Sequence, residues 1–122
     1  MSITVKGFSW VGVGTDDYES SLRFFTQVLG FSVEHSGDRQ AILSVAPGQQ
    51  LEIFGRHGRG KELNTPPTIA FEVDDVAEAA RLLIAGGAEL VGETDSWNGH
   101  EWQYFRTPDG HLFEIKCSAP GT

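Results

Sequence analysis

The sequence predicts an α+β fold of two tandem βαβββ modules, because one order of elements occurs twice along the chain. Each copy begins with a strand, an acidic turn and a helix. The strand and helix lie at residues 8–13 and 18–29 in the first copy and at residues 68–73 and 76–85 in the second. The acidic turns correspond, since Asp74 follows Asp16 by 58 residues, and each copy closes on a strand centred on an acid, Glu52 or Glu114. Self-similarity at a nearly constant offset is typical of a repeated structural unit.

The 122 residues are the length of a single domain. Within it we predict module one at about residues 1–58, a linker at about 59–66 and module two at about 67–118. Pro66 and Pro67 favour this boundary, because proline lacks a backbone donor and restricts the residue before it. The basic, glycine-rich cluster at residues 56–61 is interpreted as part of the connector, with attraction of an anionic ligand as the alternative.

Composition and charge exclude several classes of function. The formal net charge of −8 repels nucleic acid and anionic lipid, so neither nucleic acid nor a membrane is an expected partner. No apolar run approaches the ~20 residues that span a bilayer, and residues 1–15 do not resemble a signal peptide. Cys117 is the only cysteine, which rules out an internal disulfide and is expected to be a small buried hydrophobe. We therefore expect a soluble, cytoplasmic protein.

Both expected helices carry an apolar stripe and marked ends. The stripe is formed by Tyr18, Leu22, Phe25 and Leu29 in the first helix, and by Val76, Ala79, Ala80 and Leu83 in the second. These spacings place the apolar residues of each helix on one face. Asp16 with Glu19, and Asp75 with Glu78, are typical of capped helix starts, while glycines at 30 and 86 mark the ends.

Short strands between turn residues complete each module. The strongest turn is Pro108-Asp109-Gly110, in which proline fixes the first corner and glycine permits positive φ at the third. It is expected to join strands at residues 101–106 and 111–116 as a hairpin.

Period-two alternation then sorts the strand residues by face. Residues such as Val11, Val13, Leu51 and Ile53 are expected to face the helices. The opposite face receives Trp10, Glu52 and Phe54 in module one, and Thr68, Ala70, Glu114 and Lys116 in module two. Trp102 and Tyr104 lie on a common face, although alternation leaves open which one. Acids, aromatics and small residues together favour a cavity over a water-facing surface.

These residues resemble the vicinal oxygen chelate superfamily, which contains glyoxalase I, fosfomycin-modifying enzymes, extradiol dioxygenases and antibiotic-binding resistance proteins. The segments that carry the resemblance are Asp17, SLRFF at residues 21–25, VLGF at 28–31, IAFEVDD at 69–75 and FRTPDGHLFE at 105–114. The resemblance implies a cupped, eight-strand mixed sheet, with the cup completed across a homodimer. It also implies that metal ligands in the enzymes of this superfamily occupy the positions of Trp10, Glu52, Thr68 and Glu114.

No metal ion or other cofactor is expected at these positions. Zinc, nickel or iron favours imidazole and carboxylate ligands, whereas Trp10 supplies an indole and Thr68 a hydroxyl. An indole nitrogen has no lone pair to offer a metal. His100 is the one candidate to replace a lost ligand, and an exposed loop histidine is the alternative interpretation.

The leading hypothesis is metal-independent binding and sequestration of a small, largely aromatic molecule, as in antibiotic resistance, with no catalytic residue. The expected ligand-binding residues are Trp10, Glu52, Phe54, Thr68, Trp102, Tyr104 and Glu114. Core packing is the alternative role for the aromatic residues, and ion pairs across the dimer are the alternative for the two acids. The second hypothesis is a glyoxalase-like lyase, isomerase or epimerase that uses Glu52 or Glu114 with a divalent metal. A structural dimer whose cup is filled by its own side chains is the third.

Overall fold

The computed structural model describes residues 2–55 and 67–119 and divides into two compact units. The described residues of 10–68 are called the module-one unit, and those of 2–9 and 69–119 the module-two unit. The expected linker and the basic cluster at residues 56–61 lie outside the described residues. No helix in the described ranges is long and apolar enough to cross a membrane.

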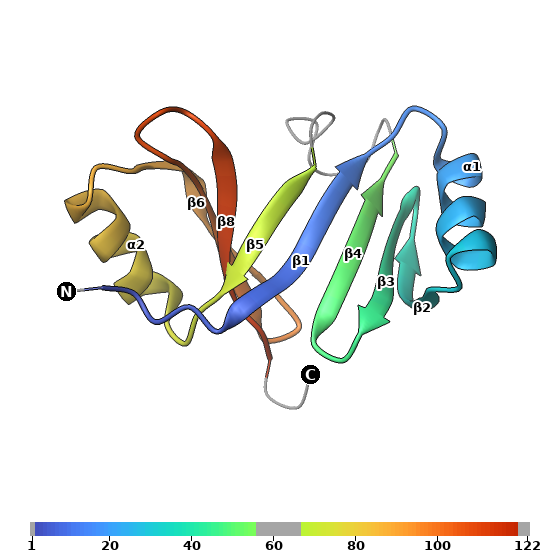
Figure 1. Ribbon diagram of the computed structural model, residues 1–122, viewed down its shortest axis with the longest axis horizontal. Helices are drawn as coiled ribbons and strands as arrows, with labels where there is room; N and C mark the ends of the chain where they lie inside the picture. The colour runs from blue at the N-terminus through green and yellow to red at the C-terminus, as the bar shows by residue number, and fades with distance from the viewer. Residues whose placement is uncertain (1, 56–66, 120–122) are drawn as a thin grey trace. The chain divides into compact units, whose positions relative to one another are not determined.

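The module-one unit is a four-strand βαβββ arrangement (Figure 1). Its elements are β1 (Gly7–Gly14), α1 (Tyr18–Arg23), a π-helical turn η1 (Phe24–Val28), β2 (Ser32–Gly37), β3 (Gln40–Ala46) and β4 (Gln49–Phe54). The strand order is β2-β3-β4-β1, in which β1 and β4 are parallel and the other pairs are antiparallel. The first three residues of β1 belong to the module-two unit.

The first helix differs from the expected continuous helix at residues 18–29. It is α-helical only to Arg23 and continues as the π-helical turn η1. Thr26 Oγ1 donates a hydrogen bond of 2.7 Å to the carbonyl oxygen of Leu22, and this competition for a helix acceptor accounts for the wider turn. The wider turn rotates Leu29 off the expected stripe, leaving it 49% exposed. The N-cap is Asp17, one residue later than the expected Asp16.

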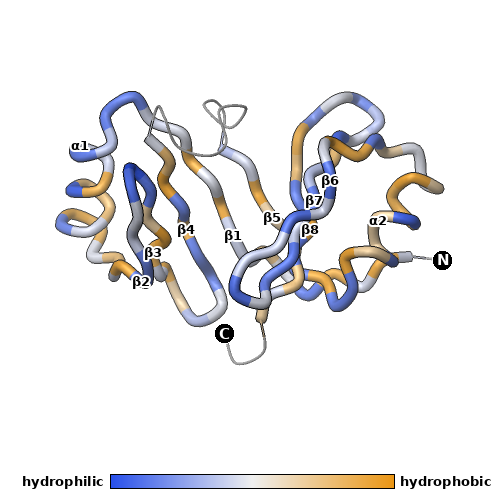
Figure 2. Tube along the Cα trace, turned by 180° about the vertical axis from the view of Figure 1, so that it is seen from behind, coloured by the Kyte–Doolittle hydropathy of each residue, from blue (hydrophilic) through white to orange (hydrophobic). Residues whose placement is uncertain are grey.

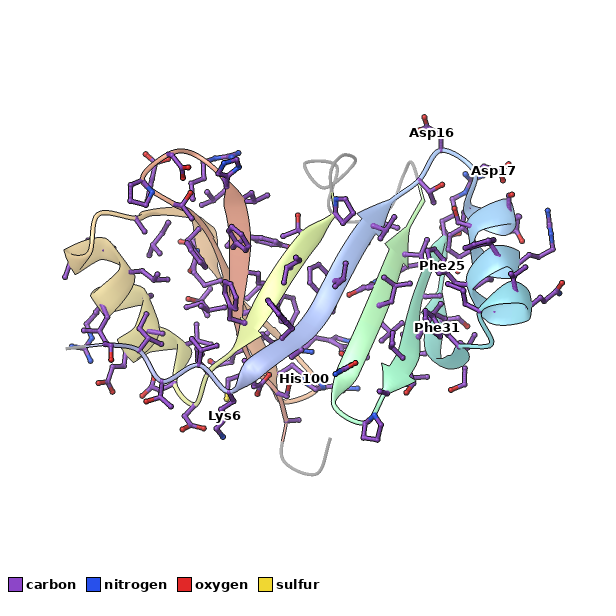
Figure 3. All side chains as sticks on the ribbon, viewed as in Figure 1. Lys6, Asp16, Asp17, Phe25, Phe31 and His100 are labelled. Atoms are coloured by element: carbon purple, nitrogen blue, oxygen red, sulfur yellow. The ribbon has the colours of Figure 1, made fainter. Side chains whose placement is uncertain are left out.

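The core of the module-one unit lies between α1 and one face of its strands. Tyr18, Leu22 and Phe25 pack against a buried cluster of Ala41, Leu43, Leu51 and Ile53, together with Val11 and Val13. Phe25 also stacks on Phe31, with ring centroids 6.2 Å apart (Figure 3). The alternation predicted for β1 and β4 is therefore confirmed, and the residues between these positions lie on the face away from α1.

The module-two unit repeats the same arrangement. Its elements are β5 (Thr68–Glu72), α2 (Val76–Ala85), β6 (Glu89–Trp97), β7 (His100–Arg106) and β8 (Leu112–Cys117). The first residue of β5, Thr68, belongs to the module-one unit. The strand order is β5-β8-β7-β6, with β5 and β8 parallel. Apolar residues predominate along α2 (Figure 2). Its start is capped by Asp75, which accepts a hydrogen bond from the backbone N–H of Glu78 at 3.0 Å, as expected.

One side of α2 forms the core of the module-two unit. Val76, Ala79 and Ala80 pack with Val73, Phe105 and Ile115, and Phe71 and Phe113 join this cluster. The N-terminal segment is held to the same unit, because the backbone N–H of Lys6 donates to the carbonyl oxygen of Glu72 at 2.9 Å and its ammonium pairs with Asp74 (Figure 3).

Equivalent residues of the two modules occupy equivalent places in their sheets. Gly12 of β1 lies beside Glu52 of β4, and Ala70 of β5 lies beside Glu114 of β8. The predicted α+β class, with two βαβββ modules and eight strands in a mixed sheet, is confirmed. The cup and the homodimer stay predictions.

Candidate functional site

A buried hydrogen-bonded network lies on the module-one strands, on the face away from α1. Trp10 Nε1 donates a hydrogen bond of 2.8 Å to Glu52 Oε1. The side-chain amide of Gln40 donates through Nε2 to the other carboxylate oxygen, Glu52 Oε2. Trp10 is 6% exposed and Glu52 is 7% exposed. The carboxylate thus receives one protein donor on each oxygen, which offsets much of the cost of burying it.

Strand register explains why these residues meet. Gly12 is the direct neighbour of Glu52 in the parallel pair of β1 and β4, so Trp10, two residues away, projects from the same face. The indole lies over Gly12, where no side chain intervenes. Phe54, two residues after Glu52, contacts the indole edge to face, with centroids 6.3 Å apart and planes at 61°. The structure therefore brings together three expected site residues of module one.

Gln40 was not predicted as a site residue. It begins β3 and lies opposite Phe54 in the antiparallel pair with β4, while Ile42 lies opposite Glu52. Gln40 is therefore a diagonal neighbour of Glu52 on the same face, within reach of a long side chain. Gln40 could have been predicted only from the register of β3 against β4, which is set by the hairpin around Pro47 and Gly48.

A transition-metal ion does not fit the Trp10 and Glu52 positions. The indole N–H is a donor and points at Glu52, so it offers no ligand atom. Both oxygens of Glu52 already accept protein donors. Across the described residues, no three or more His, Cys, Asp or Glu side chains gather in a metal-binding arrangement. The donor set of module one therefore suits hydrogen bonding rather than coordination by imidazole and carboxylate.

In the module-two unit, register settles which face Trp102 and Tyr104 occupy. Tyr104 lies opposite Glu114, and Trp102 lies opposite Lys116, in the antiparallel pair of β7 and β8. Directly opposed residues project from the same face. Phe105, their neighbour in sequence, belongs to the core beneath α2. The two aromatic residues therefore lie on the face away from α2, together with Glu114. This is one of the two faces that alternation had left open.

The same face carries two buried charged residues between partly exposed aromatic rings. Glu114 is 3% exposed and Lys116 is 6% exposed, whereas Trp102 and Tyr104 are half-buried. Charged groups are seldom this buried without partners. Thr68, the remaining expected site residue, is the buried first residue of β5.

Gln103 fixes the strand that borders this face. Its buried amide nitrogen donates to the carbonyl oxygens of Val91, Gly92 and Tyr104 at 3.0–3.1 Å, and its Oε1 accepts from Thr94 at 2.9 Å. These bonds lie at the point where the pairing of β6 and β7 shifts between Val91 and Asp95. A buried glutamine thus supplies hydrogen bonds to backbone groups beside the irregularity.

His100 begins β7 and contacts the segment after β8. Its Nδ1 accepts a hydrogen bond of 3.0 Å from the backbone N–H of Ala119 (Figure 3). Ser118 is bound in turn by Glu72, whose two oxygens accept from its N–H and hydroxyl at 2.8 Å each. His100 is therefore a half-buried residue at the start of a strand and not the exposed loop histidine considered from the sequence.

A separate cavity of about 180 Å³ lies between the N-terminal segment and α2. Ile3, Asp74, Asp75 and Glu78 are among its lining residues, and no expected ligand-binding residue lines it. It is thus distinct from both groups of candidate site residues.

Comparisons with known proteins agree with this architecture. The uncharacterized protein YetH of Bacillus subtilis (strain 168) is 25% identical over 118 residues, covering 92% of this chain and 98% of YetH. Methylmalonyl-CoA epimerase from Mycobacterium tuberculosis has a TM-score of 0.77 at 22% identity, over 98% of this chain and 93% of that one. A Streptomyces coelicolor methylmalonyl-CoA epimerase variant in complex with 2-nitronate-propionyl-CoA has a TM-score of 0.76 at 22% identity, over 95% and 99%. These likenesses support the fold. Because the family model matches residues 7–115, the chain belongs to the Glyoxalase/Bleomycin resistance protein/Dioxygenase superfamily.

Proposed function

We propose that this protein binds a small, largely aromatic molecule without a metal ion at the Trp10 and Glu52 positions. The observation that carries the proposal is the 2.8 Å hydrogen bond from Trp10 Nε1 to Glu52 Oε1. It joins the two module-one positions at which the superfamily resemblance implies metal ligands. A donor and an acceptor that satisfy each other favour recognition of an organic ligand over metal coordination.

The aromatic residues support a planar ligand. Trp102 and Tyr104 are half-buried on the face of the module-two strands that also carries Glu114. Each aromatic ring that stacks on a planar ligand contributes roughly 0.5–1.5 kcal/mol beyond the area it buries. We further propose that binding occurs in the cytoplasm and that a homodimer completes the cavity. Light scattering of the purified protein tests the dimer directly.

An epimerase or isomerase is the second candidate, and the comparisons favour it over sequestration. Methylmalonyl-CoA epimerases recur among the structures with similar folds. In this alternative, Glu52 or Glu114 moves a proton next to a carbonyl group, assisted by a divalent metal ion. The geometry of module one weighs against the metal, because Trp10 occupies a ligand position and donates to Glu52.

Two measurements separate the candidates. First, protein purified without chelator is dialysed and its metal content is measured. If the protein sequesters its ligand without a metal, we expect less than one divalent ion per chain. Second, methylmalonyl-CoA is incubated with the protein in D₂O, and mass spectrometry follows deuterium at the carbon next to the thioester carbonyl. Metal-dependent deuterium incorporation that Glu52→Gln or Glu114→Gln abolishes would establish the epimerase.

Direct binding tests the leading proposal. A panel of polycyclic aromatic antibiotics is titrated while tryptophan fluorescence is recorded, and mass spectrometry checks that each ligand is recovered unchanged. Trp102→Phe, which alters the proposed binding face, should weaken quenching, whereas Trp97→Phe on β6 is the matched control. Absence of binding by every ligand, or recovery of a chemically altered one, would contradict sequestration.

A further inference from the structure

We propose that Gln40 is a positioning residue that, together with Trp10, orients Glu52 to receive an N–H donor group of the ligand. This inference rests on the proposed small-molecule binding and specifies what the module-one residues recognise. It assigns a role to a side chain that the sequence did not single out.

Glu52 keeps acceptor capacity beyond its bonds to Trp10 and Gln40. Each carboxylate oxygen has two lone-pair directions. Trp10 uses one direction on Oε1, and Gln40 uses one on Oε2. One acceptor direction on each oxygen is therefore still unused by these two donors.

The amide of Gln40 supplies a further acceptor. Because Nε2 donates to Glu52, the carbonyl Oε1 of the same amide projects beside the carboxylate. No hydrogen bond to Gln40 Oε1 occurs within the part of the chain that the structure describes. The side chains of Gln40 and Glu52 thus present a row of acceptor oxygens whose arrangement is fixed by the hydrogen bond between them.

Neighbouring groups hold Trp10 and Gln40 in place. The Trp10 ring lies over Gly12 and against the edge of Phe54, so the donor to Oε1 cannot readily swing away. Gln40 is held at the start of β3 by its pairing with Phe54. A site whose groups are already ordered avoids part of the entropic cost of binding.

The acceptors and the aromatic rings together define the chemistry of the ligand group. A row of acceptor oxygens beside aromatic rings matches an ammonium, amidinium or aromatic amine attached to a flat ring. The same row repels a carboxylate, sulfonate or phosphate, so the pair discriminates by charge as well as by shape.

The test compares two planar probes of opposite charge. Proflavine is a flat cation with two amino groups, and anthraquinone-2-sulfonate is a flat anion. Isothermal titration calorimetry of the full chain measures both affinities for the wild type and for Gln40→Leu, Gln40→Met and the control Gln49→Leu. Gln49 is an exposed glutamine at the start of β4, so its replacement leaves Glu52 and its donors untouched.

We expect the wild type to favour proflavine, and Gln40→Leu to weaken proflavine about tenfold, as for the loss of a charge-assisted hydrogen bond. Anthraquinone-2-sulfonate should change less than about twofold, since it makes no bond to this pair. Gln40→Met retains the length of the side chain and should behave like Gln40→Leu. A parallel loss of both probes would indicate a purely structural role, and unchanged affinities would remove any role for Gln40; either result overturns the inference.

NMR distinguishes failure of the inference from failure of the proposed function. The Trp10 indole N–H reports its bond to Glu52 in the absence of ligand. In Gln40→Leu its resonance should shift and its exchange with solvent should accelerate, whereas Gln49→Leu should leave it unchanged. An unmoved resonance contradicts the positioning role even if ligands bind. If the resonance moves but the wild type binds neither probe nor the antibiotic panel, the proposed function has failed, and the recognition role of Gln40 fails with it.

Discussion

Gly12 lies directly beneath the indole of Trp10, so close that a Cβ atom at position 12 would stand 2.1 Å from Cη2 of the ring. Real Cβ atoms essentially never approach another atom this closely, so any side chain here forces the indole to move. The absence of a side chain at position 12 is therefore a condition for the hydrogen bond between Trp10 and Glu52.

Replacement of this glycine should disrupt the network. We expect Gly12→Ala to displace the indole, weaken its bond to Glu52 and lower the free energy of unfolding by about 1–3 kcal/mol, the usual range for overpacking. Urea unfolding followed by far-UV circular dichroism measures the loss, and tryptophan emission reports the displaced ring. Gly37→Ala is the control, because a Cβ there meets nothing within 4 Å. Equal stability of the two variants would show that the ring is not held as described.

Glu52 allows a test of hydrogen bonding separate from charge. In Glu52→Leu both Trp10 Nε1 and the Gln40 amide lose their acceptor, and buried unsatisfied donors should cost about 1–3 kcal/mol of stability. In Glu52→Gln the new carbonyl accepts from Trp10, and the new amide donates to Gln40 after that side chain rotates. Stability should then change by less than about 1 kcal/mol.

The two Glu52 variants are compared by urea unfolding, with cation binding as the second readout. Glu52→Gln should keep the fold while losing its preference for proflavine over anthraquinone-2-sulfonate. Should Glu52→Gln prove as unstable as Glu52→Leu, the carboxylate charge, rather than its acceptor geometry, stabilises this face.

Alternation alone predicted much of the candidate site. Period two placed Trp10, Glu52 and Phe54 on one face, because Leu51 and Ile53 between them had to reach the core beneath α1. Gln40 escaped prediction because its proximity to Glu52 depends on the register of β3 against β4, which the residue pattern of either strand does not contain. Trp102 and Tyr104 needed register for the same reason, because the residue pattern of their strand alone did not show which face meets the core.

The first helix shows a different limit of sequence patterns. A 3.6-residue period predicts one continuous stripe through Leu29. The hydroxyl of Thr26 binds the carbonyl oxygen of Leu22, however, and the backbone widens into a π turn. Such local competition between side chain and backbone is invisible to hydrophobic periodicity.

Gln103 should be important for stability although it lies on the face beneath α2. Its amide nitrogen donates to the carbonyl oxygens of Val91, Gly92 and Tyr104, and Gln103→Leu removes all of these hydrogen bonds. We expect a loss of about 1–3 kcal/mol in the free energy of unfolding and faster amide exchange along β6. Urea unfolding and hydrogen exchange measure these effects, with exposed Gln27→Leu as control. A wild-type exchange pattern along β6 in Gln103→Leu would contradict this role.

Cys117 should be a slowly reacting thiol. Burial raises its pKa, and the negative charges of Glu72, Glu101 and Asp74 act in the same direction. The thiol also donates a hydrogen bond of 3.3 Å to the carbonyl oxygen of Asp74. Because the thiolate is the nucleophile, less of the reactive form is present at a given pH than in the unfolded chain.

The rate of alkylation by iodoacetamide, measured across pH for the folded protein and for the chain in urea, tests this expectation. The folded midpoint should lie at higher pH. Since the folded pKa exceeds the unfolded one, the stability linked to Cys117 is full below the unfolded pKa and is lost as pH rises through the folded pKa. Cys117→Ser should therefore flatten the alkaline decline of the unfolding free energy. A folded midpoint at or below that of the unfolded chain would mean that burial does not control this thiol.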